Sequence, residues 1–153
     1  MSLILATGSN IGEKLHHLDT AIKKLQQHFN LIKSSRVYQS DPVEYLDQDI
    51  FYNQVLEFEK PKNMHPLEVF KTIKNIEDEM GRVKIINKGP RNIDIDIIFN
   101  GLQEYQDDQL SIPHHSWQKR SFVVLPLSEL PFYQEIKKHY QIPQVFESKA
   151  FPI

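Results

Sequence analysis

The sequence predicts an α/β (α+β) fold: a ferredoxin-like βαββαβ core with additions, forming a three-layer α-β-α sandwich with a mainly antiparallel sheet. Three observations predict it. Short apolar runs end at turn residues, two longer segments carry apolar residues three and four positions apart, and these segments follow one another in the order of that core. At 153 residues, we expect a single domain over 1–153.

Composition and charge exclude several classes of protein. Hydrophobic residues make up 40% and charged residues 25% of the chain, which is ordinary for a folded domain. The net charge of −2 argues against bulk electrostatic binding to nucleic acid or to an anionic membrane. The absence of cysteine excludes a disulfide framework and fits a reducing compartment. Because the sequence carries no signal peptide and no apolar stretch long enough to span a membrane, we expect a cytoplasmic protein.

The first half of the chain predicts three strands and one helix. Residues 3–7 form an apolar run stopped by a Gly-Ser-Asn turn, which is typical of a buried strand. Residues 32–38 and 54–59 predict the next two strands, and the polar, acidic segment 39–50 between them predicts a loop. The helix after the first strand is indicated by apolar residues three and four positions apart: Leu15, Leu18, Ile22, Leu25 and Phe29.

A second helix is predicted to begin at Pro66, which suits a first helical turn, and to end at Gly81. Its predicted buried face comprises Leu67, Phe70, Ile73, Ile76 and Met80. A basic loop over 82–90 then leads into a strand that contains Asp94 and Asp96.

The remaining segments carry weaker patterns. The pair Asn100-Gly101 is a strong hairpin signal and predicts that the chain turns back through residues 103–110. Residues 122–127 predict a further apolar strand. From residue 131 the proline-spaced tail predicts coil with one turn of helix.

Residues 89–97, Gly-Pro-Arg-Asn-Ile-Asp-Ile-Asp-Ile, are the most informative stretch for function. Side chains two apart in a strand point to the same face, so Asp94 and Asp96 lie side by side while the isoleucines face a core. Two neighbouring carboxylates repel each other unless a cation lies between them, and oxygen-only ligands favour Mg²⁺ or Mn²⁺ over zinc. Arg91 adds a planar fork suited to a phosphate. The alternative is an edge strand with a solvated polar face.

Four further features are less specific. The segment Gly-Ser-Asn-Ile-Gly at residues 8–12 either cradles a phosphate or is a tight turn in which Ser9 or Asn10 caps a helix. His114 and His115 either contact a phosphate or lie in a loop, since adjacent histidines rarely chelate one zinc ion. Glu77 is expected on its helix surface as an i,i+4 partner. The loop cations either flank a bound polyphosphate or are solvated: Arg82, Lys84, Lys88 and Arg91, with Lys119 and Arg120.

Aromatic residues near the two loops have the same ambiguity. They either pack in the core or hold a flat heterocycle between two rings: Tyr38, Phe51, Tyr52 and Phe122. Asn53 is polar within an otherwise apolar strand and is suited to hydrogen bonds with such a heterocycle.

The motif at 89–97 resembles the signature of the 6-hydroxymethyl-7,8-dihydropterin pyrophosphokinase (HPPK) family. The resemblance covers residues 1–130, with further motifs in the family's order and spacing. These are Thr-Gly-Ser-Asn-Ile-Gly at 7–12, Ser-Ser-Arg-Val-Tyr-Gln-Ser at 34–40, Phe-Tyr-Asn at 51–53, Ile-Glu through Gly-Arg at 76–82, Leu-Ser-Ile-Pro-His at 110–114, and Arg-Ser-Phe-Val-Val at 120–124 with Pro-Leu at 126–127.

The resemblance implies an enzyme of folate biosynthesis. Such an enzyme transfers pyrophosphate from ATP to the hydroxymethyl group of 6-hydroxymethyl-7,8-dihydropterin and releases AMP. The resemblance implies that Asp94 and Asp96 hold two Mg²⁺ ions that bridge the ATP phosphates. It also implies a monomer whose partners are these two small-molecule substrates, with the segments 39–50 and 82–90 closing over them.

Site residues are implied position by position. The implied catalytic residues are Arg82, Arg91, Asp94 and Asp96. The implied ATP contacts are Glu77, Lys84, Arg91, Ile97, His114 and Arg120, with Ile97 near the adenine. The implied pterin contacts are Ser40, Val43, Phe51, Asn53 and Phe122, with the pterin stacked between the two phenylalanines.

The sequence departs from the family pattern in its loops and keeps the metal carboxylates. Lys88 stands where the family commonly has a tryptophan that seals the site, and Lys84 where an arginine is often found. Phe51 replaces a tyrosine and keeps the stacking ring, and Asp41 takes a position usually held by proline. We therefore expect an active enzyme with altered loop closure.

Three other functions stay open on the sequence alone. A noncatalytic nucleotide- or RNA-binding module would explain the fold and the aromatics, but it needs a basic sheet face in place of paired aspartates. A two-metal phosphodiesterase or nuclease would explain Asp94 and Asp96, but it normally recruits further Asp, Glu or His ligands. A degenerate relative would bind pterin or ATP without turnover.

Overall fold

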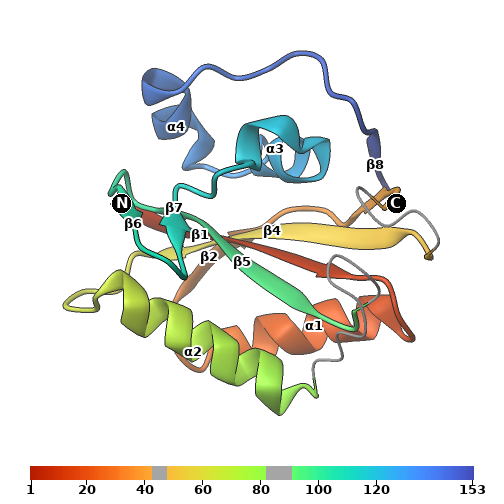
Figure 1. Cartoon of the computed structure of the whole chain (residues 1–153), viewed down its shortest axis with the longest axis horizontal. Coiled ribbons are helices and arrows are strands. Elements are labelled where there is room, and N and C mark those ends of the chain that lie inside the picture. Colours follow the sequence, from red (N-terminus) through yellow and green to blue (C-terminus); the bar gives the residue numbers. More distant parts are fainter. Residues whose placement is uncertain (43–47, 82–90) are drawn as a thin grey trace.

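The computed structural model describes residues 1–42, 48–81 and 91–153. These residues form three layers, with one sheet in the middle and helices on both of its faces (Figure 1). The predicted three-layer α-β-α sandwich is therefore confirmed. No helix in the described ranges is long and apolar enough to cross a membrane.

The central sheet is antiparallel throughout its described pairings. Its strand order is β5-β1-β4-β3-β8, and β2 also pairs with β4. The strands are β1 (Ser2–Ser9), β2 (Leu31–Ser34), β3 (Tyr38–Ser40), β4 (Phe51–Glu59), β5 (Asp94–Asn100) and β8 (Ala150–Pro152). Along the chain, the elements from β1 to β5 follow the predicted βαββαβ order, with β2 and β3 together in the place of one strand.

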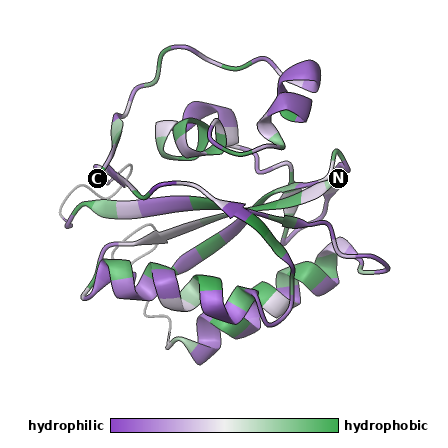
Figure 2. Cartoon of the chain, turned by 180° about the vertical axis from the view of Figure 1, so that it is seen from behind, coloured by the Kyte–Doolittle hydropathy of each residue, from purple (hydrophilic) through white to green (hydrophobic). Residues whose placement is uncertain are grey.

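The helices divide between the two faces of the sheet (Figure 1). On one face lie α1 (Lys14–Leu25) and α2 (Pro66–Glu79), each of which carries hydrophobic and hydrophilic stretches (Figure 2). The other face carries α3 (Ser121–Leu127), which follows the short 3₁₀ helix η1 (Trp117–Lys119), and α4 (Tyr133–His139). The small strands β6 (Tyr105–Gln106) and β7 (Ser111–Ile112) pair with each other, outside the main sheet.

Each face of the sheet has its own hydrophobic core. Ile4 and Leu5 are adjacent in β1 but belong to different cores, because successive side chains of a strand point to opposite faces. The core under α1 and α2 includes Leu5, Leu25, Phe58, Ile73 and Ile95. The core under α3 and α4 includes Ile4, Val55, Phe99, Trp117 and Val124.

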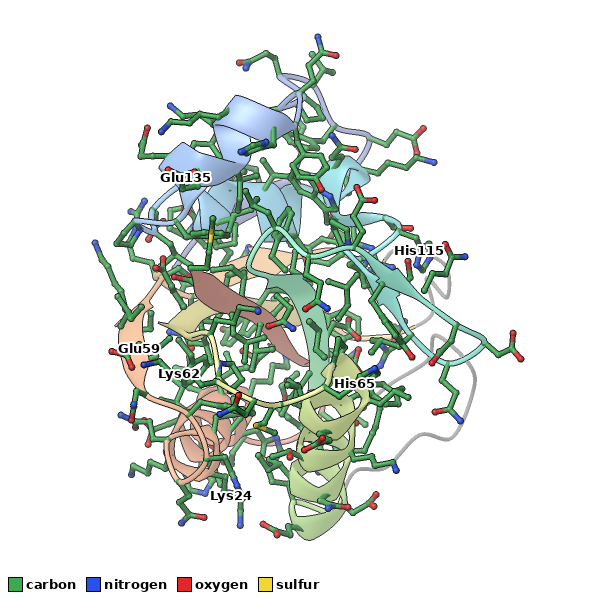
Figure 3. The ribbon with its side chains drawn as sticks, turned by 90° about the vertical axis from the view of Figure 1, so that its left-hand side faces the viewer. Lys24, Glu59, Lys62, His65, His115 and Glu135 are labelled. Atoms are coloured by element: carbon green, nitrogen blue, oxygen red, sulfur yellow. The ribbon has the colours of Figure 1, made fainter. Side chains whose placement is uncertain are left out.

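The helix α2 begins and ends where the sequence predicts. His65, which precedes it (Figure 3), is the N-cap, and its Nδ1 accepts the N–H of Leu67 at 3.1 Å. Pro66 occupies the first helical turn, where its missing N–H costs nothing. Gly81 ends the helix with a φ of +66°, a conformation that disfavours any side chain.

The predicted strand over 32–38 is wrong, since it is two strands, β2 and β3, separated at Ser35. The N–H of Ser35 donates to the carbonyl of Val55 at 2.9 Å, and the Oγ of Ser35 accepts the N–H of Val55 at 3.0 Å. A side-chain oxygen thus replaces a backbone acceptor and interrupts the regular ladder. Leu15, predicted to be buried in the first helix, is 51% exposed.

Residues 122–127 were predicted as a strand and this prediction is wrong, because they lie in α3. The buried residues Val123, Val124 and Leu127 fall on one side of this helix, at spacings of one and three positions. The β-branched pair favours a strand in isolation, but packing against the sheet decides the conformation. Pro126 lies inside this helix and has no N–H to donate to the carbonyl of Phe122, so the helix lacks one regular hydrogen bond there.

The hairpin and tail predictions are also corrected. Gly101 makes the predicted turn, with a φ of +60°, but the chain then forms β6, which pairs with β7 and not with β5. The tail contains the predicted short helix, α4, followed by coil, but it ends in a strand, β8, that was not predicted. The N–H of Phe132 donates to the Oε1 of buried Glu57 at 2.9 Å, and this bond anchors the start of α4 to the sheet.

Candidate active site

The two predicted carboxylates lie on the same face of β5, as the alternating pattern predicts. Asp94 pairs with Gly8 and Asp96 with Ala6 of β1. Ile95 and Ile97 point the other way, into the core under α1 and α2. Because Gly8 and Ala6 are small, the sheet beside the carboxylates is not filled by long side chains. On the α3 side of the sheet, the surface beside the two carboxylates is therefore formed by small residues.

Arg91 joins the carboxylates to a predicted pterin residue. Its Nη1 donates to Oδ2 of Asp94 at 3.1 Å, and the side chains of this pair are only 13% and 21% exposed. The same guanidinium lies 5.3 Å from the ring centroid of Phe51, within the range of a cation–π contact. The structure thus brings together predicted catalytic, metal-binding and pterin-binding residues.

Asn53 lies in the row of paired residues that crosses the sheet to Asp94. It pairs with Gly8 in β1, and Gly8 pairs with Asp94 in β5. The Nδ2 of Asn53 donates to the Oγ of Ser40 at 2.7 Å, so these two predicted pterin residues are in contact. A Cβ at Gly8 would lie 3.3 Å from the Oδ1 of Asn53 and 3.8 Å from Phe51. The glycine therefore leaves room for both side chains.

Asp96 has a perturbed electrostatic environment. Although Asp96 keeps some exposed surface, burial and the neighbouring charge of Asp94 raise its pKa from 3.8 to about 7. The cations Arg120 and Lys74 oppose this rise only in part. A divalent cation between the two carboxylates would remove the repulsion and hold both in the charged form.

The donor set fits magnesium. It consists of two carboxylates, and Mg²⁺ is commonly bound by one or two carboxylates together with water and substrate phosphates. Within the described ranges, no group of three His, Cys, Asp or Glu side chains is arranged to hold a metal by itself. Asp94 and Asp96 are thus suited to a metal that arrives with a polyphosphate.

Glu77 is not the surface residue that its position on the helix predicts, because it is only 1% exposed. Its Oε2 accepts the N–H of Ile95 at 2.8 Å, and its Oε1 accepts from the Nζ of Lys74 at 3.0 Å. Burial raises the pKa of Glu77, and the charge of Lys74 opposes the rise. The carboxylate therefore holds the open edge of β5 between the two aspartates.

Arg120 and Phe122 lie at the start of α3, in the layer that covers this face of the sheet. Arg120 immediately precedes α3, and its guanidinium lies 5.6 Å from the ring centroid of Phe122. The positive charge of Arg120 lowers the pKa of Asp96 and so opposes the effect of burial. Phe122 and Phe51 therefore come from two facing layers, α3 and the sheet.

His114 and Ile97 lie at the outer edge of β5. The N–H of His114 donates to the carbonyl of Ile98 at 3.0 Å, and its Nδ1 accepts the N–H of Ser116 at 3.1 Å. Its ring stacks on that of His115, with centroids 4.7 Å apart; Figure 3 labels His115. The side chain of Ile97 is 4% exposed and packs in the core under α1 and α2, so it faces away from the aspartates.

Four residues singled out in the sequence lie outside the described ranges. They are Val43, Arg82, Lys84 and Lys88.

Asn10 is a site residue whose role the sequence did not predict. Its Oδ1 accepts the N–H of Arg91 at 2.9 Å, and its N–H donates to the carbonyl of Arg91 at 3.1 Å. Its Nδ2 donates to Gln48 at 2.8 Å and to the carbonyl of Asp49 at 3.1 Å. Asn10 therefore fixes Arg91 beside the segment that leads into Phe51. The position of Asn10 after Gly8 and Ser9 indicated a functional turn, but the same position equally indicated a helix cap.

Comparison with known proteins identifies the family. Residues 4–131 match the family described as 7,8-dihydro-6-hydroxymethylpterin-pyrophosphokinase (HPPK). The 2-amino-4-hydroxy-6-hydroxymethyldihydropteridine pyrophosphokinase of Bacillus subtilis (strain 168) is 36% identical over 128 residues, which cover 82% of this chain and 75% of that protein.

Larger proteins contain a similar segment. The folic acid synthesis protein fol1 of Pneumocystis carinii is 37% identical over 130 residues, covering 84% of this chain and 17% of the relative. The folic acid synthesis protein FOL1 of Dictyostelium discoideum is 42% identical over 127 residues, covering 82% of this chain and 19% of the relative. The chain thus spans less than a fifth of the length of these two relatives.

Solved structures support the fold. A crystal structure of HPPK-DHPS in complex with substrates has a TM-score of 0.65 at 14% identity, covering 97% of this chain and 46% of that chain. The Plasmodium falciparum HPPK-DHPS triple mutant with pteroate has a TM-score of 0.60 at 17% identity, covering 83% of this chain and 39% of that chain. Together with the family match over most of the sequence, these relatives show that the chain belongs to the 7,8-dihydro-6-hydroxymethylpterin-pyrophosphokinase (HPPK) family.

Proposed function

We propose that this protein transfers pyrophosphate from ATP to the hydroxymethyl group of 6-hydroxymethyl-7,8-dihydropterin, giving the pterin diphosphate and AMP in folate synthesis. The observation that carries the proposal is the contact of Arg91 with both Asp94 and Phe51. It joins a polyphosphate site to a site for a flat ring, as a reaction between ATP and a pterin requires. The bacterial relative named for this activity supports the same conclusion.

The carboxylates and cations act on the ATP side. Asp94 and Asp96 would hold two Mg²⁺ ions, which when bound supply neutralisation of the phosphate oxygens. Arg91 binds phosphate oxygens through its planar fork, which the bond to Asp94 already orients. Arg120 adds positive charge from the side of α3. His114 and the outer edge of β5 contact the nucleotide, and Arg82 and Lys84 add phosphate contacts.

The sheet and α3 bind the pterin. Phe51 and Phe122 stack on its two faces, while Asn53 and Ser40 form hydrogen bonds with its edge, together with the backbone at Val43. The existing bond between Asn53 and Ser40 orients the amide before the substrate arrives. The aromatic walls also exclude water from the reacting phosphate.

The proposed chemistry is an in-line displacement at phosphorus. The hydroxymethyl oxygen of the pterin forms a bond to the β-phosphorus of ATP, and the bond from that phosphorus to the bridging oxygen of the α-phosphate breaks. AMP leaves with the electron pair of this bond, and the hydroxyl proton is lost to solvent. The residues contribute mainly by positioning the two substrates and by stabilising charge at the phosphates.

A product assay tests the proposal. Purified protein with Mg²⁺, ATP and 6-hydroxymethyl-7,8-dihydropterin should release AMP, and only when the pterin is present. ADP as the product, or nucleotide hydrolysis without pterin, would refute it. An Asp96→Asn variant serves as the matched control, because it removes the charge at almost unchanged volume and should abolish AMP formation while the fold persists.

A further inference from the structure

One carboxylate joins the sheet to the end of α3. The hydroxyl of Tyr38 in β3 donates to Oε2 of Glu129, which lies just beyond α3. The backbone N–H of Arg36 donates to Oε1 of Glu129 at 2.9 Å, and the Nε of Arg36 donates to Oε2 at 3.2 Å. Glu129 therefore accepts three hydrogen bonds from the segment at and just before β3. We call these contacts the Tyr38–Glu129 link.

The protonation states make this link a strong one. Burial and the bond to Glu129 raise the pKa of Tyr38 to about 12, so its hydroxyl remains a donor at neutral pH. Burial alone would raise the pKa of Glu129, but the bonds from Arg36 and Tyr38 outweigh it and lower that pKa. A hydrogen bond to an ionised acceptor is roughly twice as strong as a neutral one.

On the sheet side, the link lies beside the proposed pterin site. Tyr38 is 5% exposed and pairs directly with Asn53 of β4. The row continues through Gly8 to Asp94, so four adjacent strands place these residues side by side. Two residues further along β3, Ser40 accepts the Nδ2 of Asn53. The backbone that carries Tyr38 thus also positions the polar residues of the pterin site.

On the helix side, the link holds the helix that carries the other wall of the site. The helix α3 packs against β4 and β3 and has only seven residues, with Phe122 near its start and Glu129 just past its end. Because α3 is only about two turns long, it moves as one rigid body. A restraint at its C-terminal end therefore also restrains its N-terminal end. A flat ring contacts two aromatic walls only when they are about 7 Å apart, twice a carbon contact distance of about 3.5 Å.

We propose that Tyr38 and Glu129 are positioning residues that set the distance between Phe122 on α3 and the Phe51–Asn53 surface of the sheet, and thereby the affinity for the pterin. The inference rests on the proposed function. Neither residue needs to touch a substrate. The ATP side is built mainly on Asp94 and Asp96 of β5, three strands from Tyr38, so it is expected to be affected less, through Arg120 at the start of α3.

The test compares two tyrosine variants. Tyr38→Phe removes the hydroxyl and keeps the ring. The control Tyr140→Phe makes the same change on the same side of the sheet, in the apolar cluster under α3 and α4, where Tyr140 packs on Trp117. Pterin binding is measured by calorimetry with Mg²⁺ and α,β-methylene-ATP, which cannot release AMP. We expect Tyr38→Phe to raise the pterin Kd about tenfold and to change the Kd for the ATP analogue much less, with Tyr140→Phe like wild type.

A double-mutant cycle separates positioning from general destabilisation. The double variant Tyr38→Phe/Glu129→Gln should have a pterin Kd no higher than that of the single variant with the higher Kd, because both changes break the same link. Additive effects, or equal losses of pterin and ATP-analogue affinity, would overturn the inference. An unchanged pterin Kd in Tyr38→Phe would overturn it as well. Wild-type protein that binds no pterin would overturn the proposed function and this inference together.

Discussion

Nη1 of Arg91 lies 3.1 Å from Oδ2 of Asp94, while the same guanidinium lies 5.3 Å from the ring centroid of Phe51. Arg91 thus connects the residues proposed for the metal with those proposed for the pterin. Its backbone is fixed in turn by Asn10, through hydrogen bonds of 2.9 and 3.1 Å. The site is therefore organised around a residue whose position does not depend on a bound ligand.

Asp96→Asn should separate activity from stability. The substitution removes a carboxylate that is repelled by Asp94, so the protein without metal should unfold at the same temperature as wild type or higher. Turnover should fall at least about a hundredfold, because one metal ligand is lost. Thermal unfolding in a chelator and initial-rate assays with Mg²⁺ measure the two effects. A fall in Tm with activity retained would contradict the assignment of Asp96.

The raised pKa of Asp96 predicts how stability depends on pH. The folded-state pKa of about 7 lies above the ordinary value of 3.8, so the folded protein holds this proton to higher pH than the unfolded chain. The contribution of Asp96 is therefore most favourable below the ordinary value and is lost as the pH rises to about 7. In a chelator, the unfolding free energy of wild type relative to Asp96→Asn should fall over this range.

Magnesium should reverse that trend. A cation binds only the ionised carboxylate, so the increase in Tm on adding Mg²⁺ should be small near pH 5 and larger near pH 8, on either side of the pKa of about 7. Titration of Mg²⁺ during thermal unfolding measures the effect, with Asp96→Asn as the control. Equal stabilisation of both proteins at both pH values would exclude this cation site.

Glu77→Ala should destabilise the fold more than a surface substitution on the same helix. It leaves the buried N–H of Ile95 without its acceptor, which costs about 1–3 kcal/mol. The control Glu79→Ala removes an ion pair with Lys24 in which the glutamate side chain is 54% exposed, and should change stability by less than about 1 kcal/mol. Urea unfolding of both variants gives the comparison. Equal losses would show that Glu77 does not hold β5.

Gly8→Ala should weaken pterin binding more than ATP binding. The added Cβ would lie 3.3 Å from the Oδ1 of Asn53, so the amide must shift by a few tenths of an ångström from its place beside Ser40. We expect the KM for the pterin to rise several-fold while the KM for ATP changes little. Steady-state kinetics with each substrate varied in turn distinguish the two. A larger effect on ATP would place the pterin elsewhere.

Features with local causes were predictable from the sequence. The alternation of Asp94 and Asp96 with isoleucines follows from strand geometry alone, and it correctly placed the carboxylates on one face. The limits of α2 followed from Pro66 and Gly81, since a first-turn proline and a left-handed glycine need no tertiary context. The helical spacing of the buried residues in α3 was also a local feature, but the β-branched pair Val123 and Val124 favoured the prediction of a strand.

Features that depend on distant partners were not predictable. The burial of Glu77 depends on the N–H of Ile95, 18 residues away. The strand β8 is stable because it adds to β3, and nothing within the tail itself indicates that partner. Tyr38 and Glu129 are 91 positions apart, so neither residue signalled the other. In each case tertiary structure supplies the hydrogen-bond partner.

Mass spectrometry of the pterin product tests the central claim most directly. The protein is incubated with Mg²⁺, ATP and 6-hydroxymethyl-7,8-dihydropterin. The masses and amounts of the pterin and nucleotide products are then measured in the same sample. Transfer of pyrophosphate predicts a pterin that has gained two phosphoryl groups, with an equal amount of AMP. A pterin carrying one phosphoryl group with ADP, or an unmodified pterin beside hydrolysed ATP, would contradict pyrophosphoryl transfer at Asp94 and Asp96.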